Sequence, residues 1–169
     1  MARFQNGLAA ASLMILASAV SLGVAHAADV TAKAGGSIID ALTIEKTEDL
    51  YFGTIVPSAT ASDTVRINTG GELICGASLT CLGDDASVAA FSVRGERRFT
   101  YSVSLPEQVV LSNGSDTMTI ISLDSSIGSQ GTIAPNGRDA FTVGGTLSVA
   151  ASQAPGDYSG TFNVTVEYN

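Results

Sequence analysis

The 169-residue chain has no tryptophan, one histidine, two cysteines and only eight lysine or arginine residues. Proteins that bind nucleic acids need a basic surface to contact phosphates, and eight basic against sixteen acidic residues exclude that class. Charged residues make up only 14% of the chain, whereas hydrophobic residues make up 45%. Because disordered chains are poor in apolar residues, this composition and length indicate a single folded domain.

The N-terminal residues have the parts of a secretory signal peptide. Arg3 supplies a positive charge, residues 8–24 form an apolar run, and Ala25-His26-Ala27 places small residues where a signal peptidase recognises them. The alternative is a membrane anchor, but the run is interrupted by serines and is at the short end for the ~20 residues that span a bilayer. We therefore predict that residues 1–27 are a signal peptide and that the exported chain has no transmembrane segment.

Removal of residues 1–27 leaves seven basic and sixteen acidic residues, a net charge of −9, and no histidine. Ser-His-Asp and Cys-His catalytic arrangements are then excluded, and no glycine-rich phosphate-binding motif is present in the sequence. The neighbouring acids of Glu48-Asp49 and Asp84-Asp85 are typical of solvated loops. Asp84-Asp85 also lacks the spaced acidic ladder of a calcium loop. We therefore predict a protein that is not an enzyme and has no cofactor or metal.

The two cysteines, Cys75 and Cys81, are separated by five residues. An even number of cysteines in an exported chain favours a disulfide. A redox pair usually has two residues between its cysteines, and a metal site needs further cysteine or histidine ligands. We predict that Cys75 and Cys81 form a local structural disulfide across a hairpin.

Apolar and polar residues alternate along most of the exported chain, as they do in strands that bury one face. This alternation is clearest over residues 65–67, 89–93, 99–105, 118–120 and 141–149. Turn-forming residues separate the runs, and no segment keeps a 3.6-residue apolar period for three turns; residues 45–49 suit one helical turn at most. The pattern predicts an all-β, antiparallel β-sandwich that forms a single domain over residues 28–169.

Three of the seven basic residues of the exported chain lie in the segment Arg94-Gly95-Glu96-Arg97-Arg98. Such a segment could recognise an acidic surface or a glycan. A charged hairpin turn between the strands that contain Phe91 and Phe99 fits the same residues better. We therefore interpret the segment as a turn.

The C-terminal residues show the longest alternation in the chain. One face is apolar or small, and the other is polar. The residues of the apolar face are Tyr158, Gly160, Phe162, Val164, Val166 and Tyr168. We predict a half-buried strand over residues 158–168, about 37 Å long at a rise of ~3.4 Å per residue.

This ending resembles that of the subunits of bacterial chaperone–usher pili. Those pilins end in an alternating apolar strand with a penultimate tyrosine and a glycine fourteen residues from the end, positions held here by Tyr168 and Gly156. The early strand Leu50–Ile55 and the segment Gly156–Thr161 also look like a family of uncharacterised bacterial secreted domains. We group that family with pilin-like and spore-coat-like sandwiches, and the resemblance covers most of the exported chain.

The resemblance implies an immunoglobulin-like, Greek-key sandwich that lacks its last strand. A partner then completes the sheet by β-augmentation, in which backbone hydrogen bonds give affinity and alternate side chains fill pockets. The strand over residues 158–168 would form one wall of the groove. Residues 28–36 would be the donor strand, with Val30, Ala32 and Ala34 facing inward. The same residues also suit the first strand of a complete sandwich.

Two functions follow from these expectations. The first is a structural subunit of a fimbria-like fibre, which passes through the periplasm to the cell surface and has a periplasmic chaperone, an usher and like subunits as partners. The alternative is a monomeric secreted sandwich that binds a glycan or an envelope protein. Self-assembly of the exported chain distinguishes the first function from the second.

Overall fold

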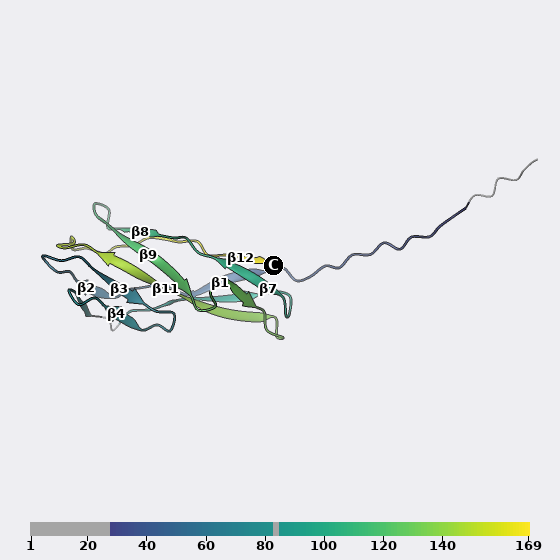
Figure 1. The fold of residues 1–169 in the computed structure, drawn as a ribbon, viewed down its shortest axis with the longest axis horizontal. Coiled ribbons are helices and arrows are strands. Elements are labelled where there is room, and N and C mark those ends of the chain that lie inside the picture. Colours follow the sequence, from purple (N-terminus) through teal and green to yellow (C-terminus); the bar gives the residue numbers. More distant parts are fainter. Residues whose placement is uncertain (1–27, 83–84) are drawn as a thin grey trace, which may run out of the picture. The chain divides into compact units, whose positions relative to one another are not determined.

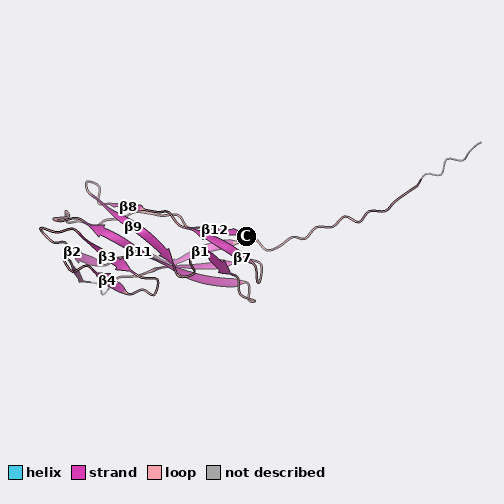
Figure 2. Cartoon of the chain, in the orientation of Figure 1, coloured by secondary structure: helices cyan, strands magenta, loops and turns pink. Residues whose placement is uncertain are grey.

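The computed structural model describes residues 28–82 and 85–169. The predicted signal peptide, residues 1–27, and Asp84 lie outside the described residues. Every regular element among the described residues is a strand (Figure 2). None of them belongs to a helix with the length and apolar character needed to cross a membrane. The chain divides into two units, residues 1–36 and residues 37–169, and the strands all belong to the second unit.

The strands of the second unit form exclusively antiparallel pairs (Figure 1). They are β1 (Thr43–Glu48), β2 (Thr54–Val56), β3 (Asp63–Ile67), β4 (Leu73–Cys75), β5 (Thr80–Leu82), β6 (Ala89–Arg94), β7 (Thr100–Ser104), β8 (Val109–Ser112), β9 (Thr117–Ser125), β10 (Gln130–Thr132), β11 (Arg138–Val149) and β12 (Thr165–Tyr168).

The largest sheet has seven strands. Its main order is β1-β6-β11-β3-β4, and β9 pairs with both β11 and β8. A second sheet has the order β10-β7-β12, and β2 and β5 form a third, two-stranded sheet. These curled antiparallel sheets form a sandwich-like arrangement that fits an immunoglobulin-like fold, so the predicted all-β class is confirmed.

The long strand β11 connects the two clusters of the hydrophobic core. Phe141 and Val143 belong to one cluster, and Leu147 and Val149 belong to the other, so the predicted alternation along this strand is confirmed. Between these two pairs, a Cβ atom on Gly144 would lie 2.3 Å from the backbone oxygen of a residue at the end of β3. The close approach of β3 to β11 therefore requires a glycine at this position.

The segment expected to form at most one helical turn, residues 45–49, lies mainly in strand β1 instead. β1 pairs with β6 and has exposed side chains at every position except Ile44. Its glutamate and lysine residues have weak strand propensity. Backbone pairing with a buried neighbour outweighs that propensity.

The disulfide between Cys75 and Cys81 is present, but it does not close a hairpin. Cys75 ends β4, which pairs with β3, whereas Cys81 lies in β5, which pairs with β2. The bond therefore joins two different sheets. The hairpin prediction is wrong because the spacing of two cysteines fixes the length of the loop but not the strand with which each flanking segment pairs.

Asp63 holds the loop between the two cysteines against β3. Its carboxylate accepts hydrogen bonds from the backbone N–H groups of Ser78 at 2.9 Å and Thr64 at 2.8 Å. These donors, with Ser78 the stronger, hold the pKa of Asp63 below its ordinary value of 3.8. The amide of Gly76 also donates to the carbonyl of Thr64 at 2.9 Å. The loop is thus fixed by backbone contacts as well as by the disulfide.

Replacing both cysteines by serine should lower the free energy of unfolding by about 2 kcal/mol, because the loop closed by the bond no longer restricts the unfolded chain. Urea unfolding followed by circular dichroism measures the change. Ala77→Ser, an exposed change within the same loop, is the matched control and should leave the midpoint unchanged. A double variant that unfolds at the wild-type midpoint would show that the disulfide does not stabilise the fold.

Candidate functional site

The C-terminal segment has the predicted alternation of burial but a shorter ladder than predicted. The paired strand β12 covers only Thr165–Tyr168, where it is antiparallel to β7. Upstream, Ser159 forms an isolated bridge with Ser112 at the end of β8. The C-terminal segment therefore lies first beside β8 and then beside β7. The residues that link β7 to β8 include Pro106, which has no N–H to donate. An interrupted partner backbone explains why the pairing does not run from residue 158 to residue 168.

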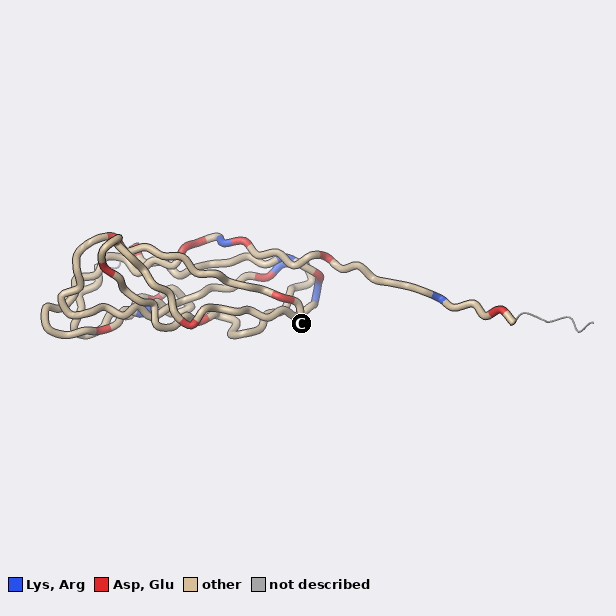
Figure 3. Tube along the Cα trace, turned by 90° about the horizontal axis from the view of Figure 1, so that it is seen from above, with Lys and Arg blue, Asp and Glu red and all other residues tan. Residues whose placement is uncertain are grey.

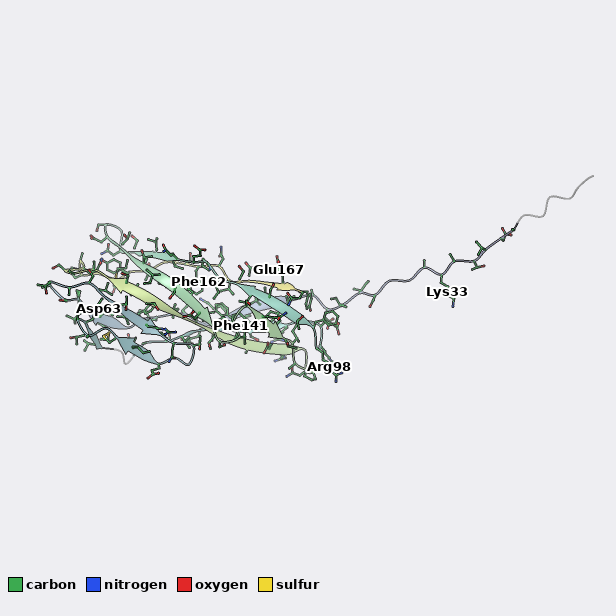
Figure 4. The ribbon with its side chains drawn as sticks, viewed as in Figure 1. Lys33, Asp63, Arg98, Phe141, Phe162 and Glu167 are labelled. Carbon is green, nitrogen blue, oxygen red and sulfur yellow. A yellow bond between two sulfur atoms is a disulfide. The ribbon has the colours of Figure 1, made fainter. Side chains whose placement is uncertain are left out.

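The side chains predicted for the apolar face lie against the core, with one exception. Tyr158, Phe162, Val164, Val166 and Tyr168 are half-buried and pack on the core clusters. Gly160 is exposed, and a Cβ atom there would lie 2.5 Å from the backbone oxygen of a β8 residue. The glycine at position 160 thus allows the backbone of the C-terminal segment to lie close to the backbone of β8. Phe162 and Glu167 mark this segment in Figure 4.

Two edge strands border the same core cluster. β12 is the last strand of its sheet and pairs only with β7 among the described strands, and β1 is the last strand of the large sheet and pairs only with β6. Ile44 of β1 and Val166 of β12 both pack on the cluster that contains Phe91 and Phe141. Each of the two strands therefore presents one row of backbone N–H and C=O groups without a strand partner among residues 28–82 and 85–169.

Tyr168 fixes the end of β12. Its hydroxyl accepts a hydrogen bond from the backbone N–H of Glu96 at 2.6 Å and donates one to the carbonyl of Asp40 at 2.9 Å. The ring makes an edge contact with Phe99, with 5.8 Å between the centroids. A Cβ atom on Gly95 would lie 2.2 Å from the tyrosine hydroxyl, so only glycine allows this contact. One side chain thus joins the β6–β7 connection to Asp40, which lies three residues before the start of β1.

The connection between β6 and β7 is not the hairpin that we predicted for Arg94–Arg98. β6 pairs with β1 and β11, whereas β7 pairs with β10 and β12. The chain therefore crosses from one sheet to the other through this segment. Alternation identifies both strands, but it carries no information about which strands are neighbours, and so the hairpin interpretation is wrong.

β7, the partner of β12, is anchored by a buried tyrosine whose hydrogen bond to Asp139 has no signal in the sequence. Tyr101 is 0% exposed, and its hydroxyl donates a hydrogen bond to Asp139 at 2.9 Å. Burial, together with the neighbouring Asp139 carboxylate, raises the pKa of Tyr101 far above its usual range. The ring covers Gly131 of β10, where a Cβ atom would lie 2.4 Å from it. This contact depends on the pairing of β10 with β7, so it has no local sequence signal.

The predicted donor residues Val30, Ala32 and Ala34 lie in the other unit. Residues 28–36 contain no strand, and their side chains are exposed, with Val30 at 94%. The acidic pair Glu48-Asp49 lies at and just beyond the end of β1, where Asp49 forms an ion pair with Lys46. No group of three potential metal ligands occurs among residues 28–82 and 85–169.

Tyr168→Phe should lower the free energy of unfolding by about 1–2 kcal/mol, because the amide of Glu96 and the carbonyl of Asp40 both lose their partner. Thermal and urea unfolding measure the change. Tyr51→Phe removes the same hydroxyl from a half-exposed side chain and is the control that should have little effect. Equal stability of the Tyr168→Phe variant and wild type would contradict the proposed role of this hydroxyl.

Comparison with known proteins identifies a family but no individual relative. No curated protein and no solved structure matches the chain significantly. The model of a domain of unknown function, DUF4402, matches residues 42–168, which run from just before β1 to the end of β12. This match names no pilin or fimbrial family, so the pilin resemblance remains a prediction. Because the match covers most of the sequence, the chain belongs to the DUF4402 family.

Proposed function

We propose that the protein is a structural subunit of a pilus-like surface fibre, in which residues 28–36 of one copy complete the sandwich of the next. The observation that carries the proposal is the pair of edge strands, β1 and β12, that border one core cluster. An extended peptide laid along such an edge gains backbone hydrogen bonds from it, and its alternate side chains reach the core. A donor strand between β1 and β12 would satisfy backbone groups of both edges.

β12 is the better acceptor of the two edges because it has fewer protective charges than β1 and no shift in register. In natural sheets, charged side chains, prolines or bulges on the edge strands prevent pairing with another chain. β1 has such features, since Glu45, Lys46 and Glu48 are exposed and its register shifts between Lys46 and Glu48. β12 contains neither a proline nor a lysine, and its only charged residue is Glu167. Its open edge therefore favours the addition of a strand.

Residues 28–36 have the properties that a donor for this edge needs. Val30, Ala32 and Ala34 alternate with polar residues, and the whole segment is exposed and contains no strand of its own. The inward side chains of the donor are small. Small side chains suit this site, because Phe162 and Val164 already pack against the core along the acceptor segment. Affinity would then come mainly from backbone hydrogen bonds.

The direction of the donor follows from the two edges. β1 begins opposite Arg94, and β12 ends where Tyr168 meets Glu96, so the two strands run in opposite directions. A donor antiparallel to β12, the more stable arrangement, is parallel to β1. It enters beside Tyr168 and leaves toward the Tyr158 end of the acceptor segment. Successive subunits would therefore stack head to tail, a heterologous contact that extends into a fibre.

An open edge of this kind needs a temporary cover before assembly. The predicted signal peptide would deliver the chain to the periplasm, where a chaperone strand could occupy the edge of β12 and prevent non-specific aggregation. An usher would then exchange the chaperone strand for residues 28–36 of the next subunit. Like subunits are thus the final partners, and the assembled fibre is displayed at the cell surface.

Ala32→Asp should abolish assembly, because it places a charge on the face of the donor that turns toward the core. Thr31→Asp adds the same charge to the adjacent, outward-facing position and is the matched control that should still assemble. Size-exclusion chromatography with light scattering of the exported chain measures the outcome. Both variants should retain the circular dichroism spectrum of the wild type, since residues 28–36 contain no strand.

Two results would overturn the proposal. The first is a wild-type chain that stays monomeric at high concentration and binds no synthetic peptide of residues 28–40. The second is equal assembly by Ala32→Asp and Thr31→Asp, which would show that the alternation of the N-terminal segment has no role in self-association.

A further inference from the structure

Four arginines gather near the end of β12 in a domain that is otherwise acidic. They are Arg94, Arg97, Arg98 and Arg138. Arg94 and Arg138 are direct partners in the antiparallel ladder between β6 and β11, so their side chains lie on the same face. Figure 3 shows blue segments near the C-terminus, and Figure 4 labels Arg98 far from Asp63. The fold thus brings Arg138, which follows Arg94 by forty-four positions in the sequence, next to the basic segment Arg94–Arg98.

None of these arginines forms an ion pair with a described residue. The two ion pairs among residues 28–82 and 85–169 join Lys46 to Asp49 and Arg66 to Asp124, both in other places. Four guanidinium groups at one end of a protein with sixteen acidic residues are an unusual concentration of positive charge. Arginine presents its donors in a planar fork that matches carboxylate, phosphate and sulfate groups. The cluster is therefore suited to an oxyanion supplied from outside the chain.

Three of the four arginines line a surface cavity of about 380 Å³. The lining residues are Asp40, Ala41, Arg94, Gly95, Arg97, Asn136, Gly137 and Arg138. The walls of the cavity are tied together by backbone contacts, since Gly95 donates a hydrogen bond to the carbonyl of Gly137 at 3.2 Å. Asp40 belongs to the same framework, because its amide donates to Glu96 at 3.2 Å. The volume lies within the range of small-ligand sites.

We propose that this cavity binds the acidic group of a saccharide, with Arg94, Arg97 and Arg138 holding the oxyanion. The lining also includes Asp40, which has a carboxylate, and Asn136, which has an amide side chain. A site for a bare anion gains nothing from a carboxylate, whereas a ligand with hydroxyl groups can donate hydrogen bonds to it. Phe99, 41% exposed and adjacent to Arg98, offers an apolar face at the same end of the domain. The mixture of cationic and acceptor residues in the lining, with Phe99 outside it at the same end of the domain, favours an acidic sugar.

This proposal is independent of donor-strand assembly. The cavity is formed by residues 40–41, the end of β6 with the β6–β7 connection, and the start of β11 with the turn before it. No residue of β12 lines it. A protein that failed to assemble could still bind the saccharide, and a fibre could form without it. The two proposals therefore fail separately.

The test is a calorimetric titration of the exported chain with a trisaccharide of galacturonate. The neutral galactose trisaccharide and inorganic phosphate serve as comparison ligands at the same ionic strength. We expect the uronate trisaccharide to bind saturably and the neutral trisaccharide not to bind. Phosphate should bind more weakly than the uronate. The affinity for the uronate should fall as the sodium chloride concentration is raised. The double variant Arg94→Gln/Arg138→Gln should bind the uronate about tenfold more weakly or worse, because charge-assisted hydrogen bonds are lost.

Arg66→Gln is the matched control, since it removes an arginine whose guanidinium pairs with Asp124 elsewhere on the large sheet. It should bind the uronate with wild-type affinity. The proposal is overturned if no saturable binding occurs or if the neutral sugar binds equally well. It is also overturned if Arg66→Gln weakens binding of the uronate as much as the Arg94→Gln/Arg138→Gln double variant does. Equal affinity for phosphate and the uronate would overturn the assignment to a saccharide. If the wild-type chain binds no sugar and the double variant loses self-association, the arginines belong to a contact between copies instead.

Discussion

The short ladder between β12 and β7 is the contact on which the candidate site depends. It closes the second sheet, sets the register of the C-terminal segment, and leaves the other backbone row of β12 without a strand partner among the described residues. Tyr168 fixes that register by binding the backbone of Glu96 and Asp40. Backbone donors and acceptors need partners wherever water is excluded. A single strand thus completes one sheet and leaves the open edge to which we propose that a donor strand is added.

The remaining features of the fold hold this edge in place. Tyr101 anchors β7 through Asp139, and β11 joins the two clusters of the core. The disulfide fixes the two-stranded sheet to the large sheet at a distance from β12. The arginine-lined cavity lies where β12 ends and β1 begins. Strand addition and recognition of an acidic ligand can therefore use neighbouring parts of one domain without sharing residues.

Alternation along the chain predicts the fold class and most of the buried faces, although Phe99, at the start of the predicted alternation over residues 99–105, lies outside β7 and is 41% exposed. Tyr101, Val103, Phe141 and Val143 are buried as expected, and the predicted residues of the C-terminal face are half-buried except for Gly160, which is exposed. Pairing was not predictable, because a period of two residues shows that a strand has a buried face but not which strand lies beside it. The two hairpin interpretations, for the disulfide and for Arg94–Arg98, failed for this reason. The grouping of Arg138 with Arg94 depends on the same long-range pairing and has no local signal.

The central claim is that residues 28–36 of one copy pair with β12 of another, and trapping that pair with a disulfide tests it most directly. A copy with Lys33→Cys is mixed with a copy with Thr165→Cys under mild oxidation, since both positions face outward and lie opposite each other when Val30 of the antiparallel donor pairs with Tyr168. The account predicts a covalent dimer that forms rapidly and is inhibited by a peptide of residues 28–40. Arg66→Cys, exposed on β3, is the control acceptor. Cross-linking to position 66 as fast as to position 165 would contradict the account.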